Sequence, residues 1–182
     1  MTFLVNQPDY WIGVPEYWPF TSVDGSIHVE SAEQFAVECA AELVGFGMPE
    51  SRTLPVLRIV ARDAEESGFR HYVAFPDDPP TSVIARSERY TDGHEPHDPD
   101  RDFVAPPWSD EFTTASGIAG EQSVKHYVYA ANGTSVVAEN TYVFRHGDET
   151  YRIVYADLDL QIFERVRPLI ADLASTVHWV ED

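Results

Sequence analysis

The chain has one cysteine, Cys39, and one lysine, Lys125, among its 182 residues. A single cysteine excludes an intramolecular disulfide framework and any zinc or iron–sulfur site built from several cysteine ligands. No apolar run approaches the ~20 residues that a membrane-spanning helix needs. The first residues show neither the basic nor the apolar region of a signal peptide. We therefore expect a cytoplasmic protein without membrane insertion.

Positive charge is scarce, because 12 Lys and Arg residues stand against 31 Asp and Glu residues, giving a formal net charge of −19. Nucleic-acid binding relies on Lys and Arg to neutralise phosphates, so this balance argues against a nucleic-acid partner. An anionic membrane surface is disfavoured for the same reason. The acidity suits a basic partner, and it is equally typical of a GC-rich genome or of adaptation to high salt.

The remaining composition, with 43% hydrophobic residues, is that of an ordinary globular protein. A chain of this length buries roughly two thirds of its unfolded surface, so it folds without a disulfide or a metal. We expect one domain spanning residues 1–182.

The clearest helix begins after Ser31. Ser31 suits the N-cap position, and Gln34, three residues later, completes a capping box. Apolar side chains then recur at helical spacing, and this stripe comprises Ala32, Phe35, Ala36, Cys39, Ala40, Leu43 and Val44. The single cysteine is therefore expected to be a core residue. We expect the helix to end at Gly45 or Gly47, with Pro49 preventing a restart.

Six runs are typical of strands, and they are residues 57–62, 69–75, 82–90, 123–131, 134–145 and 150–158. Between the third and fourth runs, residues 91–111 hold seven acids, four prolines and one arginine, which predicts a long acidic loop. A second helix carries the stripe Phe163, Val166, Leu169, Ile170 and Leu173. Pro168 predicts that this helix starts or kinks there. A terminal strand follows over 176–180.

This order of elements predicts an α+β fold. We expect a largely antiparallel sheet of about six to seven strands with helices packed on it.

Two turns set the predicted register of the second half. Asn132-Gly133 indicates a two-residue hairpin, and Gly147-Asp148 indicates another tight turn. Across the first turn the predicted pairs are Tyr129 with Val136, Tyr127 with Ala138 and His126 with Glu139. Across the second they are Phe144 with Tyr151, Tyr142 with Ile153 and Asn140 with Tyr155. A slip of one residue would move every side chain of a strand to the opposite face.

Alternation then gathers the tyrosines on one face of this sheet. One interpretation is that a helix covers one face, and that loops and the aromatic N-terminal segment partly cover the other. The alternative is a binding surface, because tyrosine combines a rigid apolar body with a polar tip. The binding residues predicted on this alternative are Tyr127, Tyr129, Tyr142, Tyr151 and Tyr155, and Trp108 in the acidic loop is a further predicted binding residue.

Two further groups are candidates for chemistry. His126 and Glu139 are predicted cross-strand neighbours, so they form either a structural ion pair or a general-base pair. His94, His97 and Asp98 lie in the acidic loop with Asp92 and Asp100 nearby, where histidine and carboxylate ligands suit a divalent metal. Their spacing matches no established metal motif, and the alternative is a solvated acidic loop. We expect no cofactor.

The C-terminal half resembles the PsbP-like superfamily, which includes the LpqN-like actinobacterial lipoproteins. The resemblance rests on the run 150–155, the proline-containing helix at Arg167-Pro168 and the Ala174-Ser175 step into the last strand. Val14-Pro15-Glu16-Tyr17-Trp18 is similar to the opening of those domains. The resemblance implies an α/β/α sandwich and a role in binding or assembly. It supplies no catalytic residues, and the chain has no lipid-modified cysteine at its start.

The leading hypothesis is a non-enzymatic protein-binding or adaptor domain that uses an aromatic sheet face or the acidic loop. One alternative is an acidic inhibitor or immunity-type protein that neutralises a basic partner, since complementary charge speeds association. The other is a metal-dependent or acid–base enzyme that uses the histidines named above.

Overall fold

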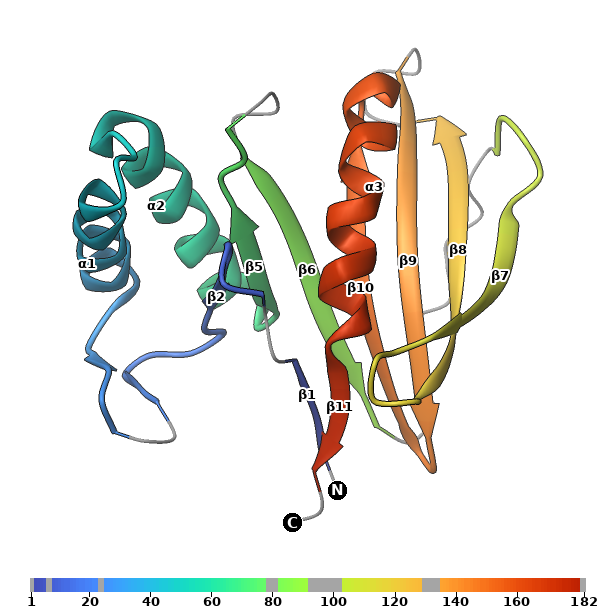
Figure 1. Ribbon diagram of the computed structural model, residues 1–182, viewed down its shortest axis with the longest axis horizontal. Helices are drawn as coiled ribbons and strands as arrows, with labels where there is room; N and C mark the ends of the chain where they lie inside the picture. The colour runs from blue at the N-terminus through green and yellow to red at the C-terminus, as the bar shows by residue number, and fades with distance from the viewer. Residues whose placement is uncertain are drawn as a thin grey trace. The chain divides into compact units, whose positions relative to one another are not determined.

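The computed structural model describes residues 2–5, 8–22, 25–77, 82–91, 103–128 and 135–180. Three helices and eleven strands lie in these ranges (Figure 1). Seven strands form one sheet in the order β2-β5-β6-β10-β9-β8-β7. The β2–β5, β7–β8, β8–β9 and β9–β10 pairings are antiparallel. The predicted α+β class and antiparallel sheet are confirmed.

The chain divides into two compact units, and each is described by itself. One unit is Tyr10–Arg86, and the other is Met1–Asp9 with Ser87–Asp182. The organisation of residues 1–182 as one domain stays a prediction. The elements of the first unit are β2 (Trp11–Val14), β3 (Phe20–Thr21), β4 (His28–Val29), α1 (Ala32–Gly45), α2 (Glu50–Ser67) and β5 (Arg70–Ala74).

Helix α1 begins and ends where its sequence predicts. The Ser31 hydroxyl accepts a hydrogen bond from the Gln34 backbone N–H at 3.3 Å. The Gln34 side chain accepts in turn from the Glu30 N–H at 3.0 Å. The helix ends at Gly45, and Gly47 follows at φ +85°. Ser31 therefore caps one N–H of the first turn, and the Gln34 side chain pairs the N–H of the residue before the cap.

Two predictions are wrong in the region of helix α2. Residues 57–62 are helical instead of forming a strand, and a helix does start directly after Pro49. Pro49 is the N-cap of α2 and has an extended backbone, with φ −68° and ψ +134°. A proline lacks an N–H that the start of a helix would leave unpaired, so it is tolerated there. The buried side chains recur at helical spacing and are Thr53, Leu57, Val60, Ala61 and Ala64.

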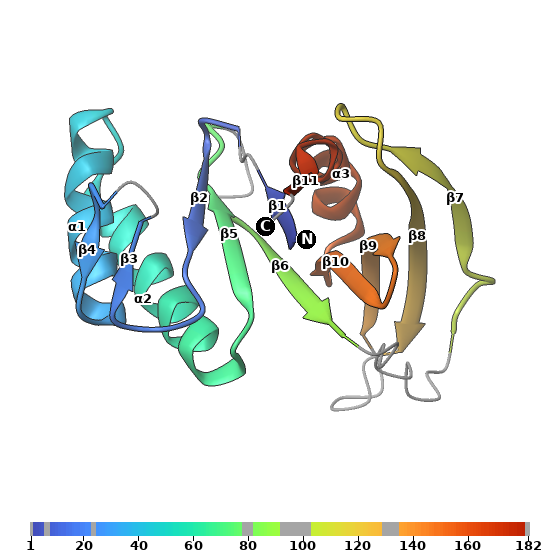
Figure 2. The same cartoon turned by 90° about the horizontal axis from the view of Figure 1, so that it is seen from below.

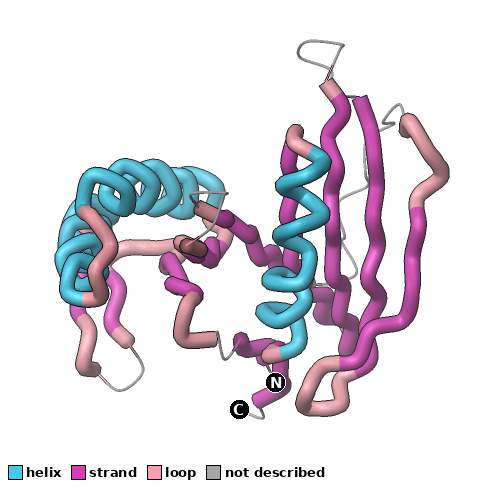
Figure 3. Tube along the Cα trace, turned by 45° about the horizontal axis from the view of Figure 1, so that its top comes forward, coloured by secondary structure: helices cyan, strands magenta, loops and turns pink. Residues whose placement is uncertain are grey.

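The core of the first unit lies between these two helices and the strands. Figure 3 shows α1 and α2 side by side. Phe35 and Ala36 from α1, Leu57 and Val60 from α2, and Val73 from β5 are all buried in one apolar cluster. The shared burial of apolar area holds these elements together.

The second unit contains the longest strands of the sheet. Its elements are β1 (Thr2–Val5), β6 (Val83–Tyr90, from Ser87 onward), β7 (Trp108–Thr113), β8 (Ala119–Val128), β9 (Val136–His146), β10 (Glu149–Asp157), α3 (Leu160–Ser175) and β11 (Val177–Val180). Figure 1 shows α3 running along β9 and β10. Pro168 lies inside α3, and the predicted terminal strand is β11, which pairs with β1.

The β9–β10 register is the predicted one. Phe144 pairs with Tyr151 and Tyr142 with Ile153. Gly147, in the connecting turn, has φ +55°, the left-handed conformation that glycine adopts readily.

The β8–β9 register differs from the prediction by one residue. Tyr127 pairs with Val137 instead of Ala138, and His126 pairs with Ala138 instead of Glu139. The described pairing reaches Val128 with Val136, a register that a two-residue turn at Asn132-Gly133 would not give. Asn132-Gly133 and the predicted Tyr129 pairing lie outside the described residues.

The predicted acidic loop over 91–111 is too long at its C-terminal end. Strand β7 begins at Trp108 and continues to Thr113. Its β-branched and aromatic ends pair with β8, and this pairing overrides the nearby prolines and acids. Residues 92–102 lie outside the described ranges.

Candidate functional site

Strand β7 is an edge of the sheet. It stands last in the strand order and pairs with β8 on one side. In Figures 1 and 2, no strand of the described ranges lies beyond it. Five of its six residues are exposed. An edge strand presents a row of backbone N–H and C=O groups that can pair with another chain.

Large apolar side chains are exposed beside this edge. Trp108 is 46% exposed, Phe103 43% and Val104 56%. Phe103 forms a bridge with Tyr127, and the Val104 N–H donates to the His126 carbonyl at 2.8 Å, so this segment is anchored to β8. The exposed apolar area is therefore held in place by the sheet.

Trp108 also contacts α3. The Arg167 guanidinium lies over the indole ring, 5.9 Å from its centroid. The same guanidinium donates through Nη1 to Glu164 Oε2 at 2.9 Å. The ring is thus fixed on one side by a cation–π contact and remains accessible elsewhere.

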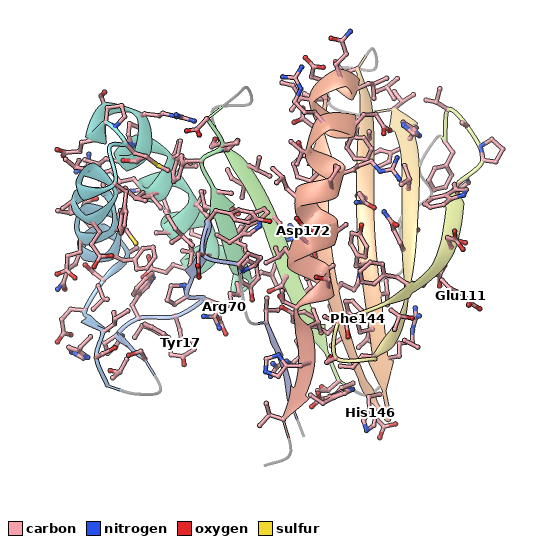
Figure 4. All side chains as sticks on the ribbon, in the orientation of Figure 1. Tyr17, Arg70, Glu111, Phe144, His146 and Asp172 are labelled. Carbon is pink, nitrogen blue, oxygen red and sulfur yellow. The ribbon has the colours of Figure 1, made fainter. Side chains whose placement is uncertain are left out.

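Two carboxylates oppose each other where β7 meets β8. Glu111 pairs directly with Glu121, and both are exposed. Figure 4 labels Glu111 on β7. Like charges directly opposite in a sheet are destabilising, and a cation placed between them removes that repulsion. Asp110, on the same strand, adds a third exposed carboxylate.

Three predicted binding tyrosines are not on an open surface. Tyr142 is 0% exposed, Tyr151 5% and Tyr155 4%. The Tyr155 ring stacks on Phe163 of α3, with 5.9 Å between centroids. Because these three tyrosines are buried, the hypothesis of an exposed tyrosine face is wrong for them.

Tyr127 belongs to the opposite face, and Tyr129 lies outside the described residues. The Tyr127 hydroxyl donates to Glu139 Oε2 at 3.0 Å. Tyr127 also lines a pocket of about 460 Å³ with Val137, Ala156, Asp157 and Leu158. It is half-buried, and its hydroxyl is engaged within the protein.

His126 and Glu139 do not form the predicted pair. His126 is opposite Ala138, whereas Glu139 is opposite Lys125, so the two side chains leave opposite faces of the sheet. The His126 ring meets Phe163, with 6.2 Å between centroids. The one-residue shift in register is the cause, and a direct proton transfer between these two groups is excluded.

Metal ligation has no support in the described ranges. Within 2–5, 8–22, 25–77, 82–91, 103–128 and 135–180, no group of three or more His, Cys, Asp and Glu side chains is arranged to hold a metal. The predicted candidates His94, His97 and Asp98 lie outside these ranges.

A buried ion pair on the face opposite α3 was not predicted from the sequence. Arg152 Nη1 lies 3.7 Å from Glu88 Oε2, and the two residues are 9% and 4% exposed. The Tyr90 hydroxyl donates to the same carboxylate. Arg152 stands between the apolar and aromatic residues of β10, and this isolated charge is the available signal, because a buried charge needs a partner. The pair is a structural element of the face and leaves no open chemistry.

His71, a buried histidine of β5, was also not predicted as a notable residue. Its Nδ1–H donates to the Phe69 carbonyl at 2.9 Å, and its Nε2 lies 2.9 Å from Asp63 Oδ2. Burial lowers the pKa of His71, while the Phe69 carbonyl and the Asp63 charge act against that shift. With Nδ1 protonated, Nε2 has a proton for Asp63 only in the charged imidazolium.

No protein-family model matches this chain, and no curated protein matches it. Across the part of the chain that the structure describes, no helix is both long and apolar enough to cross a membrane.

Proposed function

We propose that this protein is a non-enzymatic protein-binding or adaptor domain, and that its partner adds a basic extended segment to the β7 edge. The exposed edge strand with Trp108 on it is the observation that carries the proposal. In this mode of recognition, main-chain hydrogen bonds supply affinity and neighbouring side chains supply specificity.

The aromatic and apolar side chains supply the anchor for such a partner. Binding hot spots are enriched in tryptophan, which buries a large area when it is covered. Trp108 stands with Phe103 and Val104 at the end of the edge, and all are partly exposed. Arg167 holds the ring, so little conformational freedom is lost on binding.

Charge selects a basic partner. The opposed pair Glu111 and Glu121 leaves a local excess of negative charge on one face of the edge, and Asp110 adds an exposed carboxylate on the other face. A formal net charge of −19 adds long-range attraction for cationic proteins. A lysine or arginine of the partner that lies between Glu111 and Glu121 is attracted by both carboxylates.

An inhibitor that neutralises a basic toxin or nuclease would use the same surface. Salt separates the two functions, because charge-dominated association weakens as salt rises while apolar contacts persist. As a further part of the proposal, the fold is an α/β/α sandwich of the PsbP-like kind, a group whose members tend to bind or assemble other proteins.

The tagged protein is used to capture partners from a lysate of its own organism, at low and at high salt. Mass spectrometry identifies the proteins that are retained. Trp108→Ala removes the anchor and Glu111→Lys reverses the edge charge. Phe46→Ala is the control, since Phe46 is 82% exposed and belongs to the other unit.

A partner lost by both edge variants and kept by Phe46→Ala supports the proposal. Survival of that partner at high salt favours an adaptor, and its loss favours the inhibitor. Equal retention by all three variants overturns the assignment to β7.

A further inference from the structure

Alternate residues of β7 direct their backbone groups toward the free side of the strand. Just after β7, the Thr114 N–H donates to the Ile118 carbonyl at 2.9 Å. The register between β7 and β8 continues unbroken from this point, and hydrogen-bonded pairs alternate along an antiparallel ladder. The residues that bond to β8 through their backbone are therefore Trp108, Asp110 and Phe112. Those whose N–H and C=O groups point away from β8 are Ser109, Glu111 and Thr113.

A side chain covers one of these outward groups. The Glu111 N–H donates to Asp110 Oδ1 at 2.9 Å. Because this N–H points away from β8, the Asp110 carboxylate lies across the free side of the strand. Both residues are exposed, so the carboxylate has room to move away. The middle donor of the edge is therefore occupied by a group that can leave it.

A covered N–H protects an exposed edge from indiscriminate pairing. Edge strands pair readily with other chains, and charged side chains at the edge are one means by which proteins prevent this. A strand that adds along β7 needs the Glu111 N–H as a donor, so it has to displace Asp110. The displaced carboxylate loses its hydrogen bond, and an uncharged strand offers no replacement for it.

A basic side chain on the incoming strand compensates for this loss. Side chains alternate between the faces of a strand, so Asp110 and Glu111 lie on opposite faces. Directly opposed residues of neighbouring strands lie on the same face. A partner with two adjacent basic residues therefore places one beside Asp110 and the other beside Glu111. Two positions beyond the residue beside Asp110, a partner side chain meets Trp108, which favours an apolar residue there.

We propose that Asp110 is a gate on the β7 edge, which closes the Glu111 N–H to uncharged strands and opens it to strands that carry two adjacent basic residues. This inference rests on the proposed function, because it specifies the partner and the regulation of strand addition at β7. Asp110 accepts a hydrogen bond from the chain itself in the free protein and forms an ion pair with the partner in the complex.

Two synthetic peptides test the gate. One is Thr-Val-Thr-Lys-Lys-Thr-Val-Thr-amide, and the other has glutamine in place of both lysines. The sequence is the same in both directions, so a valine meets Trp108 whether the added strand is parallel or antiparallel. Fluorescein at the N-terminus reports binding of each peptide to the full chain by anisotropy. The wild type is expected to bind the lysine peptide more tightly than the glutamine peptide.

Two variants separate the hydrogen bond of Asp110 from its charge. Asp110→Ala removes both, whereas Asp110→Asn keeps an Oδ1 acceptor and removes only the charge. Binding of the glutamine peptide should tighten about two- to tenfold in Asp110→Ala, which corresponds to one ordinary hydrogen bond, and stay unchanged in Asp110→Asn. The preference for the lysine peptide should fall in both variants. Asp148→Ala is the control, because it removes the same charge from an exposed position between β9 and β10.

The gate and the proposed function fail in different ways. If Asp110→Ala binds the glutamine peptide no better than the wild type does, while the lysine peptide still binds, the gate is overturned and the proposed function stands. Equal gains in Asp110→Ala and Asp148→Ala also overturn the gate, since net charge would then be the cause.

A third peptide tests strand addition itself. The lysine peptide with N-methyl groups on its four central residues keeps the positive charge but cannot donate hydrogen bonds along the edge. Weaker binding of this peptide to the wild type supports pairing with β7. If it binds as tightly as the unmethylated peptide, or if neither binds, strand addition at β7 is overturned, and the gate is overturned with it.

Discussion

Glu111 on β7 lies directly opposite Glu121 on β8, so two exposed carboxylates share one cross-strand position at the edge of the sheet. The repulsion between the two carboxylates disfavours the pairing of the two strands, yet neither position holds a basic residue. Under the proposed function, a basic partner would supply the missing positive charge.

Replacing Glu111 with lysine should stabilise the folded protein. The change turns a repulsion into an attraction, and cross-strand pairs of this kind are worth roughly 0.2–1 kcal/mol. Urea unfolding at low and high salt measures the gain, which should shrink as salt rises. Ser109→Lys is the control, since Ser109 is exposed on the same strand and faces Ser123. An equal gain in both variants would contradict a specific effect of Glu121.

Gly120→Ala should destabilise the second unit. Gly120 pairs with Phe144, whose ring is 0% exposed, and a Cβ at Gly120 would lie 2.6 Å from Phe144 Cδ1 and 2.7 Å from the Val143 carbonyl oxygen. The carbonyl belongs to the backbone and cannot rotate away, so we expect a loss of about 1–3 kcal/mol.

Urea unfolding of Gly120→Ala measures this loss, and Gly45→Ala is the control. Gly45 ends α1, and an added Cβ there meets no atom within 4 Å. Alanine at that position is expected to be neutral or slightly stabilising, because it favours helix over the unfolded chain. A Gly120→Ala protein as stable as wild type would contradict the close packing of β8 against β9 at Gly120.

Stability should fall in mild acid because of His71. Burial holds the folded-state pKa of His71 below its ordinary value of 6.5. Between those two values the unfolded chain binds a proton that the folded chain does not, so the free energy of unfolding falls as the pH falls through 6.5 and below. The loss from this cause ends once the pH passes the folded-state pKa.

Urea unfolding across this pH range should show a shallower acid loss in His71→Gln than in wild type. His28→Gln is the control, because the His28 side chain is 54% exposed. Asp63→Asn should extend the loss to lower pH, since the Asp63 charge raises the pKa of His71 and its removal lowers it further. Identical slopes in wild type and His71→Gln would contradict this origin.

Cys39 should react slowly with iodoacetamide in the folded protein. Burial, aided by the charges of Glu42 and Glu38, raises the pKa of the Cys39 thiol from 9.0 to about 12. The thiolate is the reactive form, so its population near neutral pH falls by about a thousandfold. Mass spectrometry of alkylation in buffer and in urea measures the difference. Equal rates in the two would contradict it.

The strand-rich second half could be predicted from local patterns, and the first half less well. Residues 57–62 suit a strand by their β-branched content, and only the longer spacing from Thr53 to Ala64 identifies α2. A run of six residues is too short to distinguish the helical repeat of apolar residues from the alternation of a strand. A proline at position 49 was consistent with either an end or a start, and the neighbouring packing decided for a start.

Trp108 was predicted as a binding residue, and it is 46% exposed on β7, so its role in binding stays a prediction. The role of β7 as an edge strand was missed, because the prolines and acids around it indicate a loop.

Local chemistry alone determined α1, with its cap at Ser31, and the β9–β10 register, with its tight turn at Gly147. Those features depend on residues close in the chain, whose hydrogen bonds and backbone preferences act whatever surrounds them. Tertiary structure decided which sheet face is buried and how β8 meets β9. Burial depends on where α3 packs, and a register across a long connection depends on side-chain packing over the whole strand. These contributions to the free energy come from residues far apart in the chain, so a short window of sequence does not reveal them.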